Sequence, residues 1–213
     1  MSVGSTELKG SGGDGFAAAG AGISEKRYYM ACLDLAGRDV LVVGAGSVAL
    51  EKIDGLLEAD ARVTVVAPDV SEAVEALTRS GRVAVIRGRY RSEDLEGRFL
   101  VVAATSTTSV NERVFADADA RGMLCNVVDV PELCSFILPA VHRDDPIAVA
   151  ISTGGASPAL AQRLRDDVAR LVTREHVRLA RDLRELRPWA KTHLPTYEAR
   201  RDFFRELVEE RLG

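Results

Sequence analysis

A glycine-rich turn between a strand and a helix is the feature that most limits how this chain can fold. The hexapeptide Gly44-Ala45-Gly46-Ser47-Val48-Ala49 follows the run Val40–Val43 and opens an amphipathic segment, 47–57. The first glycine permits a tight turn, the second lets the backbone approach a pyrophosphate, and the small Ala49 lets helix and strand pack closely. Free amides at the helix start bind the anion. The motif predicts dinucleotide binding, with a plain structural turn as the alternative.

The alternation of strand and helix continues after this turn. We predict strands at 63–67, 83–86, 100–104 and 124–128 and helices at 71–79 and 109–121. Strands that alternate with helices imply a parallel sheet wound with right-handed crossovers. The predicted fold class is therefore α/β, with a Rossmann-like domain over residues 28–138.

The sequence pattern changes after this domain. Bulky Ile147, Val149 and Ile151 alternate with alanines, which predicts a strand with one large and one small face. Ser157-Pro158 predicts an N-cap followed by proline at the first helical position. Pro188 predicts the end of the next helix, and the last helices form a small terminal unit.

Composition sets the class of protein. The chain of 213 residues is 46% hydrophobic and 28% charged, which is typical of a globular protein. Its formal charge of -4 does not favour nucleic acid as a partner. Residues 1–27 are rich in glycine and serine, and we expect a flexible tail there.

The cysteines and the apolar runs concern the compartment. Cys32, Cys125 and Cys134 form neither a disulfide framework nor a zinc motif, so we expect a reducing cytoplasm. The longest aliphatic run, 99–104, is far below the roughly 20 residues of a membrane helix. We expect no membrane partner.

The second strand leads to the expected ribose site. Dinucleotide-binding motifs place an acidic residue about 20 positions after the glycines. No carboxylate lies at the end of the strand itself, and Pro68-Asp69 follows it. We expect the backbone around these two residues to meet the ribose. No arginine stands there for a 2′-phosphate, which favours NAD over NADP.

Two later segments carry further chemistry. Asp129 follows the strand at 124–128, and ligands of open α/β sheets bind beyond the carboxyl ends of the strands. This carboxylate is a candidate general base or metal ligand, or it caps the turn. Ser152-Thr153-Gly154-Gly155 precedes a helix start, so it is a candidate anion or carboxylate nest, or an ordinary tight turn.

The motifs in this order resemble the precorrin-2 dehydrogenase family of siroheme biosynthesis, including members that are also sirohydrochlorin ferrochelatases. The resemblance covers about residues 28–172. Its blocks are Leu33-Asp34-Leu35, Val42 to Ala49 with Lys52, Val65-Val66-Ala67-Pro68, Ala103-Ala104-Thr105, Asn111-Glu112-Arg113-Val114, Asn126-Val127-Val128-Asp129, Phe136-Ile137-Leu138-Pro139 and Ile151 to Pro158.

The resemblance implies an NAD-dependent oxidation of precorrin-2 to sirohydrochlorin, in some members followed by insertion of ferrous iron. It implies that Asp129 takes part in both steps, as the catalytic residue and as the contact for the metal. It also implies a homodimer formed through residues 139–175. The helical unit that we expect at 176–213 matches no motif of the family. The implied cofactor contacts are Ser47, Val48, Pro68 and Asp69. Gly44 and Gly46 of the glycine motif and Thr105 complete the candidate cofactor site.

The implied substrate is a flat polycarboxylate. The residues that could receive its carboxylates are Arg87, Arg89, Arg91, His142 and Arg143, together with the nest at Ser152, Thr153, Gly154 and Gly155. In the expected mechanism NAD accepts a hydride while Asp129 removes a proton. Two alternatives stay open, namely a non-catalytic NAD-sensing module and a chelatase that works without NAD.

Overall fold

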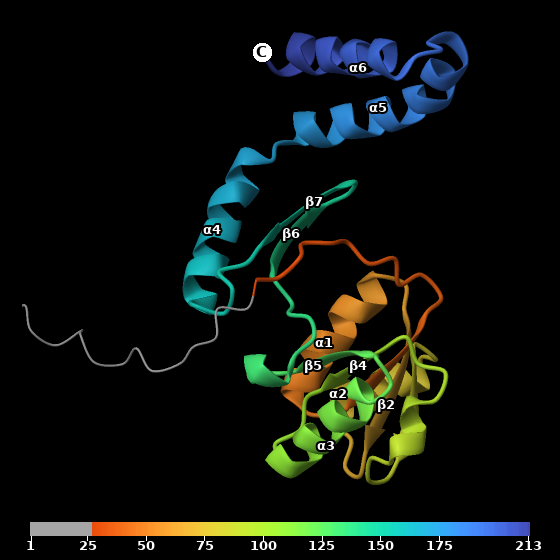
Figure 1. Ribbon diagram of the computed structural model, residues 1–213, viewed down its shortest axis with the longest axis vertical. Helices are drawn as coiled ribbons and strands as arrows, with labels where there is room; N and C mark the ends of the chain where they lie inside the picture. Colours follow the sequence, from red (N-terminus) through yellow and green to blue (C-terminus); the bar gives the residue numbers. More distant parts are fainter. Residues whose placement is uncertain (1–26) are drawn as a thin grey trace, which may run out of the picture.

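The computed structural model describes residues 27–213 of the chain (Figure 1). Nearly all of the predicted tail at 1–27 therefore lies outside the described residues. The described chain begins with an extended segment, continues into an α/β domain, and ends in a β-hairpin and three helices that extend away from that domain (Figure 1).

A five-stranded parallel sheet forms the centre of the α/β domain, which confirms the predicted fold class. The strand order is β3-β2-β1-β4-β5, and every neighbouring pair is parallel. The strands are β1 (Asp39–Val43), β2 (Arg62–Ala67), β3 (Val83–Arg87), β4 (Leu100–Ala103) and β5 (Leu124–Val127). In β1, Val43 is in register with Val66 of β2 and Ala103 of β4, so the three strands end together.

Helices cover both faces of this sheet. Side chains of α1 (Ser47–Glu58) and α2 (Glu72–Arg79) pack on one face, in a core that includes Val40 and Val42. On the other face α3 (Thr108–Asp119) packs in a second core. The central strands are buried on both faces, which explains their continuous β-branched sequence. Each fully buried valine or isoleucine contributes about 1.5–3 kcal/mol to folding.

A β-hairpin and a helix follow the sheet domain. The hairpin pairs β6 (Ala140–Asp144) with β7 (Ile147–Ile151) in antiparallel register, and α4 (Pro158–Leu171) packs beside both strands. The predicted cap of α4 is confirmed, because the Ser157 hydroxyl accepts a hydrogen bond from the Leu160 amide at 3.2 Å. β6 was not predicted from the sequence.

Two long helices complete the chain. These are α5 (Arg174–His193) and α6 (Tyr197–Leu212), which lie side by side (Figure 1). The predicted helix end at Pro188 is wrong, because α5 continues through that residue. Proline costs a helix interior about 3 kcal/mol. Here the ring of the neighbouring Trp189 packs against the ring of Phe203 of α6, with 5.5 Å between the ring centroids, and Ala190 is fully buried. Packing between the two helices therefore outweighs the cost of the proline.

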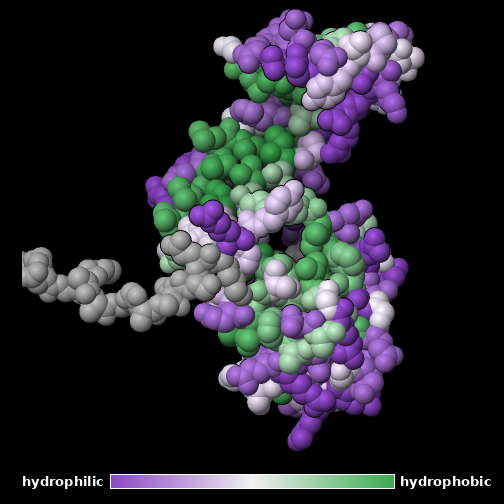
Figure 2. Space-filling model, viewed as in Figure 1, coloured by the Kyte–Doolittle hydropathy of each residue, from purple (hydrophilic) through white to green (hydrophobic). Residues whose placement is uncertain are grey.

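Apolar side chains lie exposed on the segment after the sheet domain. Figure 2 shows hydrophobic surface gathered over α4, whereas the helices beyond it are mostly hydrophilic on this face. Leu160, Leu164 and Leu171 of α4 are 50%, 41% and 70% exposed. Within residues 27–213, no helix combines the length and the apolar content needed to cross a membrane.

Candidate functional site

The site lies where the winding of the sheet reverses. After β1 the chain moves outward through β2 and β3, then returns to place β4 on the other side of β1. In open α/β sheets ligands bind in the crevice at this switch point, beyond the carboxyl ends of the strands. Gly44 follows β1 and Ala104 follows β4, so the glycine turn borders the crevice.

Gly44 is required here by both its backbone conformation and its surroundings. Its φ is +111°, and a Cβ atom at this position would lie 2.4 Å from the carbonyl oxygen of Ala104. The Gly44 amide donates to the Val66 carbonyl at 2.9 Å, which holds the turn against β2. Any other residue would collide with the β4 backbone, so the glycine sets how closely the two strand ends approach.

The start of α1 offers an open anion site. Gly46 is the N-cap of this helix, and apart from its chain neighbours no residue of the described part, 27–213, lies within 4 Å of the position that a Cβ would take. Ser47 is exposed, Val48 is 45% exposed, and the first turn holds no acidic side chain. The amides and the helix dipole favour a phosphate at this place. These residues fit the pyrophosphate of a dinucleotide, and a dinucleotide such as NAD would supply hydride acceptance there.

The predicted ribose residues lie next to this turn. Pro68 and Asp69 are exposed directly after β2. The amide of Ser71 donates to the Ala45 carbonyl at 3.2 Å, which ties the β2–α2 connection to the glycine turn. The structure therefore brings both sequence-predicted segments of the nucleotide site together.

Thr105 lies at the end of β4, on the other side of Gly44. Its side chain is bound by Asn111 of α3, whose amide oxygen lies 2.8 Å from the Thr105 hydroxyl. The Asn111 amide nitrogen donates to the Thr105 carbonyl at 2.9 Å. In the sequence, Asn111 is notable only as part of a segment that resembles the family, and no role could be predicted for its side chain. Its role depends on the shape of the β4–α3 turn, for which the local pattern holds no signal.

Asp129 occupies a tight turn after β5. The Val130 amide donates to the Val127 carbonyl at 3.2 Å, and Asp129, in the third position of this turn, has a φ of +61°. Glycine and asparagine favour this left-handed region, and other residues there are enriched at functional sites. Within residues 27–213, the exposed Asp129 carboxylate has no hydrogen bond or ion pair. It is available to a ligand.

A buried thiol holds the turn that carries this carboxylate. The Cys134 sulfur lies 3.2 Å from the carbonyl oxygens of both Val127 and Val130 and accepts from the Val127 amide at 3.3 Å. The next residue, Ser135, accepts from the Cys125 amide at 2.8 Å and so covers the outer edge of β5. The role of Cys134 could not be predicted from the sequence, because its sulfur contacts backbone groups of the turn and the Asn126 side-chain amide, which donates at 3.5 Å.

The strand ends place these groups in a row. The Ala104 amide donates to the Val43 carbonyl at 2.8 Å, and the Val128 amide donates to the Ala103 carbonyl at 3.0 Å. The parallel pairing of β1, β4 and β5 therefore continues in register to the carboxyl ends of these strands. With a strand spacing near 4.8 Å, the Asp129 turn lies two strands, about 10 Å, along the sheet edge from the glycine turn.

The segment Ser152–Gly155 meets this edge from the hairpin. A Cβ on Gly155 would lie 4.0 Å from the ring of Pro131, two residues after Asp129. The Thr153 hydroxyl accepts from the Ser157 amide at 3.0 Å, and the Ser152 hydroxyl accepts from the Gly154 amide at 3.1 Å. The predicted nest is thus an ordered turn beside the Asp129 loop.

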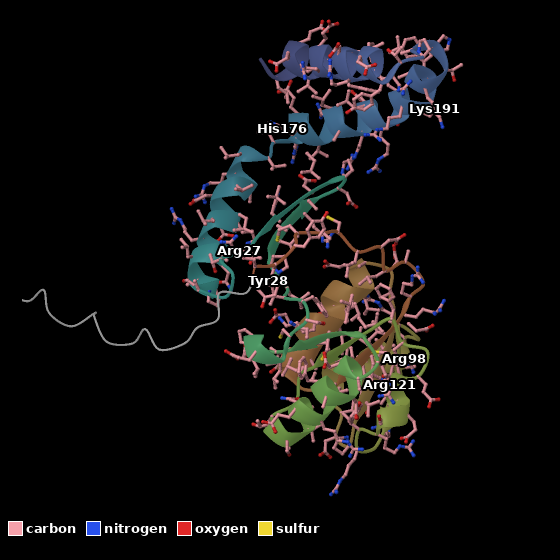
Figure 3. All side chains as sticks on the ribbon, viewed as in Figure 1. Arg27, Tyr28, Arg98, Arg121, His176 and Lys191 are labelled. Carbon is pink, nitrogen blue, oxygen red and sulfur yellow. The ribbon has the colours of Figure 1, made fainter. Side chains whose placement is uncertain are left out.

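Tyr28 is a further group near this loop that sequence reasoning missed. Figure 3 shows it between the sheet domain and the hairpin. Desolvation raises the pKa of Tyr28, and Cys134 and Glu132 raise it further, as neighbours of the phenol. A neutral hydroxyl therefore lies near the Asp129 turn.

The predicted carboxylate receptors are not all at this place. Arg87 lies on β3, at the opposite edge of the sheet from β5, and pairs with Glu75 at 2.5 Å. The expectation that Arg87 meets the same ligand as Asp129 is therefore wrong, because sequence alternation does not fix strand order. Arg89 and Arg91 follow the same edge strand and are exposed.

His142 and Arg143 lie on β6, above the site rather than in it. Residue 142 pairs with Val149, and its Nε2 atom is buried with no hydrogen-bond partner among the described residues. Arg143 is exposed. Because successive side chains of a strand point to opposite faces, it lies on the other face of the hairpin from His142. Neither side chain is seen to meet Asp129.

Other arginines of the sheet domain have structural partners. Arg98 and Arg121, labelled in Figure 3, donate to the hydroxyls of Thr64 and Ser92, each at 2.9 Å. Within residues 27–213 no group of three or more histidine, cysteine or carboxylate side chains is arranged to hold a metal ion.

The switch-point crevice and its glycine turn define a dinucleotide-binding protein of the Rossmann type. An NAD(P)-binding family model matches residues 31–140, and a model for the central part of sirohaem biosynthesis proteins matches residues 144–171. The chain belongs to the precorrin-2 dehydrogenase family of siroheme biosynthesis. The solved structure of SirC, a precorrin-2 dehydrogenase, is similar with a TM-score of 0.73 and 31% identity, covering 87% of this chain and 93% of that one.

Curated relatives extend beyond the length of this chain. The siroheme synthase of Actinobacillus succinogenes is 40% identical over 186 residues, and that of Nitrosococcus oceani is 35% identical over 183 residues. These alignments cover 87% and 86% of this chain but 39% of each relative. The chain thus spans about two fifths of the siroheme synthases that it matches.

Proposed function

We propose that this chain oxidises precorrin-2 to sirohydrochlorin, with NAD as the hydride acceptor and Asp129 as the proton acceptor. The observation that carries the proposal is the exposed, unpaired Asp129 carboxylate, held on a left-handed turn two strands from the glycine turn. Family membership and the similarity to a precorrin-2 dehydrogenase support the same reaction.

The reaction balances without any further oxidant. Precorrin-2 and NAD⁺ give sirohydrochlorin, NADH and one proton, so one hydride and one proton leave the macrocycle. The protein binds and orients two reactants that are otherwise free in solution, which is a large part of the rate enhancement available. Asp129 holds the proton on a carboxylate oxygen and releases it to water, to which its turn is open.

The glycine turn and the connections around it hold the cofactor. Amides at the start of α1 bind the pyrophosphate, and Thr105 borders the path toward Asp129. The exposed Asp69 carboxylate can accept hydrogen bonds from ribose hydroxyls and would repel a 2′-phosphate. We therefore assign NAD rather than NADP.

The tetrapyrrole lies between the Asp129 loop and the turn at 152–155. The exposed Gly154 and Gly155 have positive φ values, so their backbone can meet a substrate carboxylate closely. Gly155 lies beside Pro131, since a Cβ built on it would be 4.0 Å from the proline ring, and this brings the turn close to the reacting centre. His142 and Arg143, farther along the hairpin, stay predictions for the outer carboxylates.

We also propose a homodimer formed through the hairpin and α4. An isolated two-stranded hairpin is marginally stable in water. In β7, Ala148 and Ala150 are exposed on one face, and exposed leucines continue the apolar surface along α4. A second copy of the chain would bury this surface (Figure 2). The division into residues 28–138, 139–175 and 176–213 is part of this proposal.

We also propose that the protein works in the cytoplasm, and the argument rests on its cysteines. All three thiols are free, and Cys32 is exposed. Free thiols of this kind persist in a reducing cytoplasm.

Anaerobic incubation of precorrin-2 with the full chain tests the function. With NAD, the spectrum of sirohydrochlorin and an equal amount of NADH should appear, and without NAD neither should. Ferrous iron added next tests for the predicted chelation, since formation of siroheme would require insertion. NAD binding without oxidation would instead support a sensing module, and siroheme formed from sirohydrochlorin without NAD would support a chelatase.

A further inference from the structure

The Asn111 side chain serves the neighbouring strand end rather than its own helix. It is 8% exposed in the first turns of α3, and its amide nitrogen donates to the Thr105 carbonyl at 2.9 Å. Its amide oxygen lies 2.8 Å from the Thr105 hydroxyl and 3.4 Å from the Thr105 amide nitrogen. One buried amide therefore engages three polar groups of a single residue.

A second contact closes the same turn. The Thr107 amide donates to the Thr105 hydroxyl at 3.1 Å, and that hydroxyl also lies 3.2 Å from the Thr107 carbonyl. The hydroxyl has one proton, which it can give either to Asn111 or to Thr107. The β4–α3 connection is thus fixed from both sides of Thr105.

The peptide that Asn111 fixes is the one that faces the glycine turn. A Cβ on Gly44 would meet the Ala104 carbonyl oxygen at 2.4 Å and the Thr105 amide nitrogen at 3.3 Å. Movement of the Ala104–Thr105 peptide would therefore change the width of the crevice at the switch point. That crevice is where a dinucleotide passes between the ends of β1 and β4.

We propose that Asn111 is a positioning residue for NAD, which sets the crevice between Gly44 and the Ala104–Thr105 peptide before the cofactor binds. The inference rests on the proposed cofactor site and adds a residue that does not itself touch the cofactor. A turn that is already ordered loses less conformational freedom when the cofactor binds. Removing the contacts that order the turn should therefore weaken the affinity for NAD.

Replacement by aspartate separates hydrogen bonding from size. Asn111→Asp keeps the shape of the side chain, but a carboxylate has no proton to donate to the Thr105 carbonyl. It also brings a negative charge to the wall of a site that binds an anion. Asn111→Ala removes all three contacts and leaves the Thr105 groups without them.

The test measures NAD affinity of the full chain by titration calorimetry. We expect both Asn111 variants to bind NAD roughly tenfold more weakly or worse, because buried polar groups lose their partners. The matched control is Val114→Ala, which truncates a fully buried side chain one turn further along α3 that has no hydrogen-bonding group. Its affinity should stay within about twofold of the wild type.

A second measurement does not depend on the cofactor. Amide hydrogen exchange at Thr105 and Thr107, measured by NMR without NAD, should become faster in both Asn111 variants and stay unchanged in Val114→Ala. If Asn111→Ala does not fold, Asn111→Asp decides both measurements.

Three results would overturn the inference. These are unchanged NAD affinity in the folded Asn111 variants, an equal loss in Val114→Ala, and unchanged exchange at Thr105 and Thr107. If the wild-type chain does not bind NAD, the proposed cofactor site fails, and the exchange measurement alone still decides whether Asn111 positions the turn.

Discussion

Replacing Asp129 by glycine should make the protein more stable and inactive. Asp129 has a φ of +61° in the third position of a tight turn, where a side chain is unfavourable. Within residues 27–213 its exposed carboxylate makes no hydrogen bond or ion pair that would be lost. A catalytic role explains why a residue other than glycine occupies this unfavourable conformation without a stabilising hydrogen bond or ion pair.

The size of the effect follows from two opposing terms. The left-handed conformation costs a residue other than glycine about 1–2 kcal/mol, and aspartate lies at the low end. Glycine makes the unfolded chain more flexible, which costs about 0.5–1 kcal/mol. The difference is a net gain of up to about 0.5 kcal/mol, which raises Tm by up to roughly 2 °C in a protein of this size.

Asp60 provides a matched control. It is the other described residue besides glycine with positive φ, at +57°, and it is exposed directly after the end of α1. Glycine is preferred at such helix ends. Asp60→Gly should therefore raise Tm by a similar amount and leave NAD-dependent oxidation unchanged, whereas Asp129→Gly should lower turnover by about 10²–10⁴-fold.

Thermal unfolding and initial rates of NADH formation measure the two effects on the same samples. The reasoning is refuted if Asp129→Gly keeps wild-type turnover. It is also refuted if Asp129→Gly lowers Tm by several degrees while Asp60→Gly raises it, because the carboxylate would then stabilise the fold.

Further variants probe the cofactor turn, the proposed dimer and the thiols. Gly44→Ala should prevent stable folding, since its Cβ would lie 2.4 Å from a carbonyl oxygen, whereas Gly46→Ala should fold normally and bind NAD more weakly, as calorimetry and circular dichroism would show. Leu164→Glu should give a folded monomer in sedimentation, because this side chain is 41% exposed in a single chain. Burial, reinforced by Cys134, raises the pKa of Cys125 to about 12, so at pH 8 iodoacetamide should modify the exposed Cys32 quickly and Cys125 only after unfolding. The stability that Cys125 gains as a neutral thiol should be lost as pH rises from about 9 toward 12, which alkaline unfolding of Cys125→Ala would test.

The sheet domain could be predicted because its strands and helices have clear periodicity. The strands β1 to β4 are short apolar runs rich in valine, and the glycine turn fixes where β1 ends and α1 begins. β6 lacks such a run, since His142 and Arg143 interrupt it, and it forms by pairing with β7. Pro188 predicted a helix end from the local pattern alone, whereas contacts between α5 and α6 let the helix continue through it.

The site was predictable where a motif has a local cause. The glycine turn and Asp129 both follow strands, and parallel strands bring their carboxyl ends to one edge. Asn111 and Cys134 act through backbone groups of neighbouring loops, whose path the sequence pattern does not encode. Arg87 was misplaced because alternation leaves open which strand forms the edge of the sheet.

A single-turnover experiment with Asp129→Asn tests the central claim most directly. Asparagine keeps the left-handed turn but cannot accept the proton. The account predicts NAD affinity equal to that of the wild type and no conversion of precorrin-2 on the timescale of one wild-type turnover. Formation of sirohydrochlorin and NADH at the wild-type rate would contradict it.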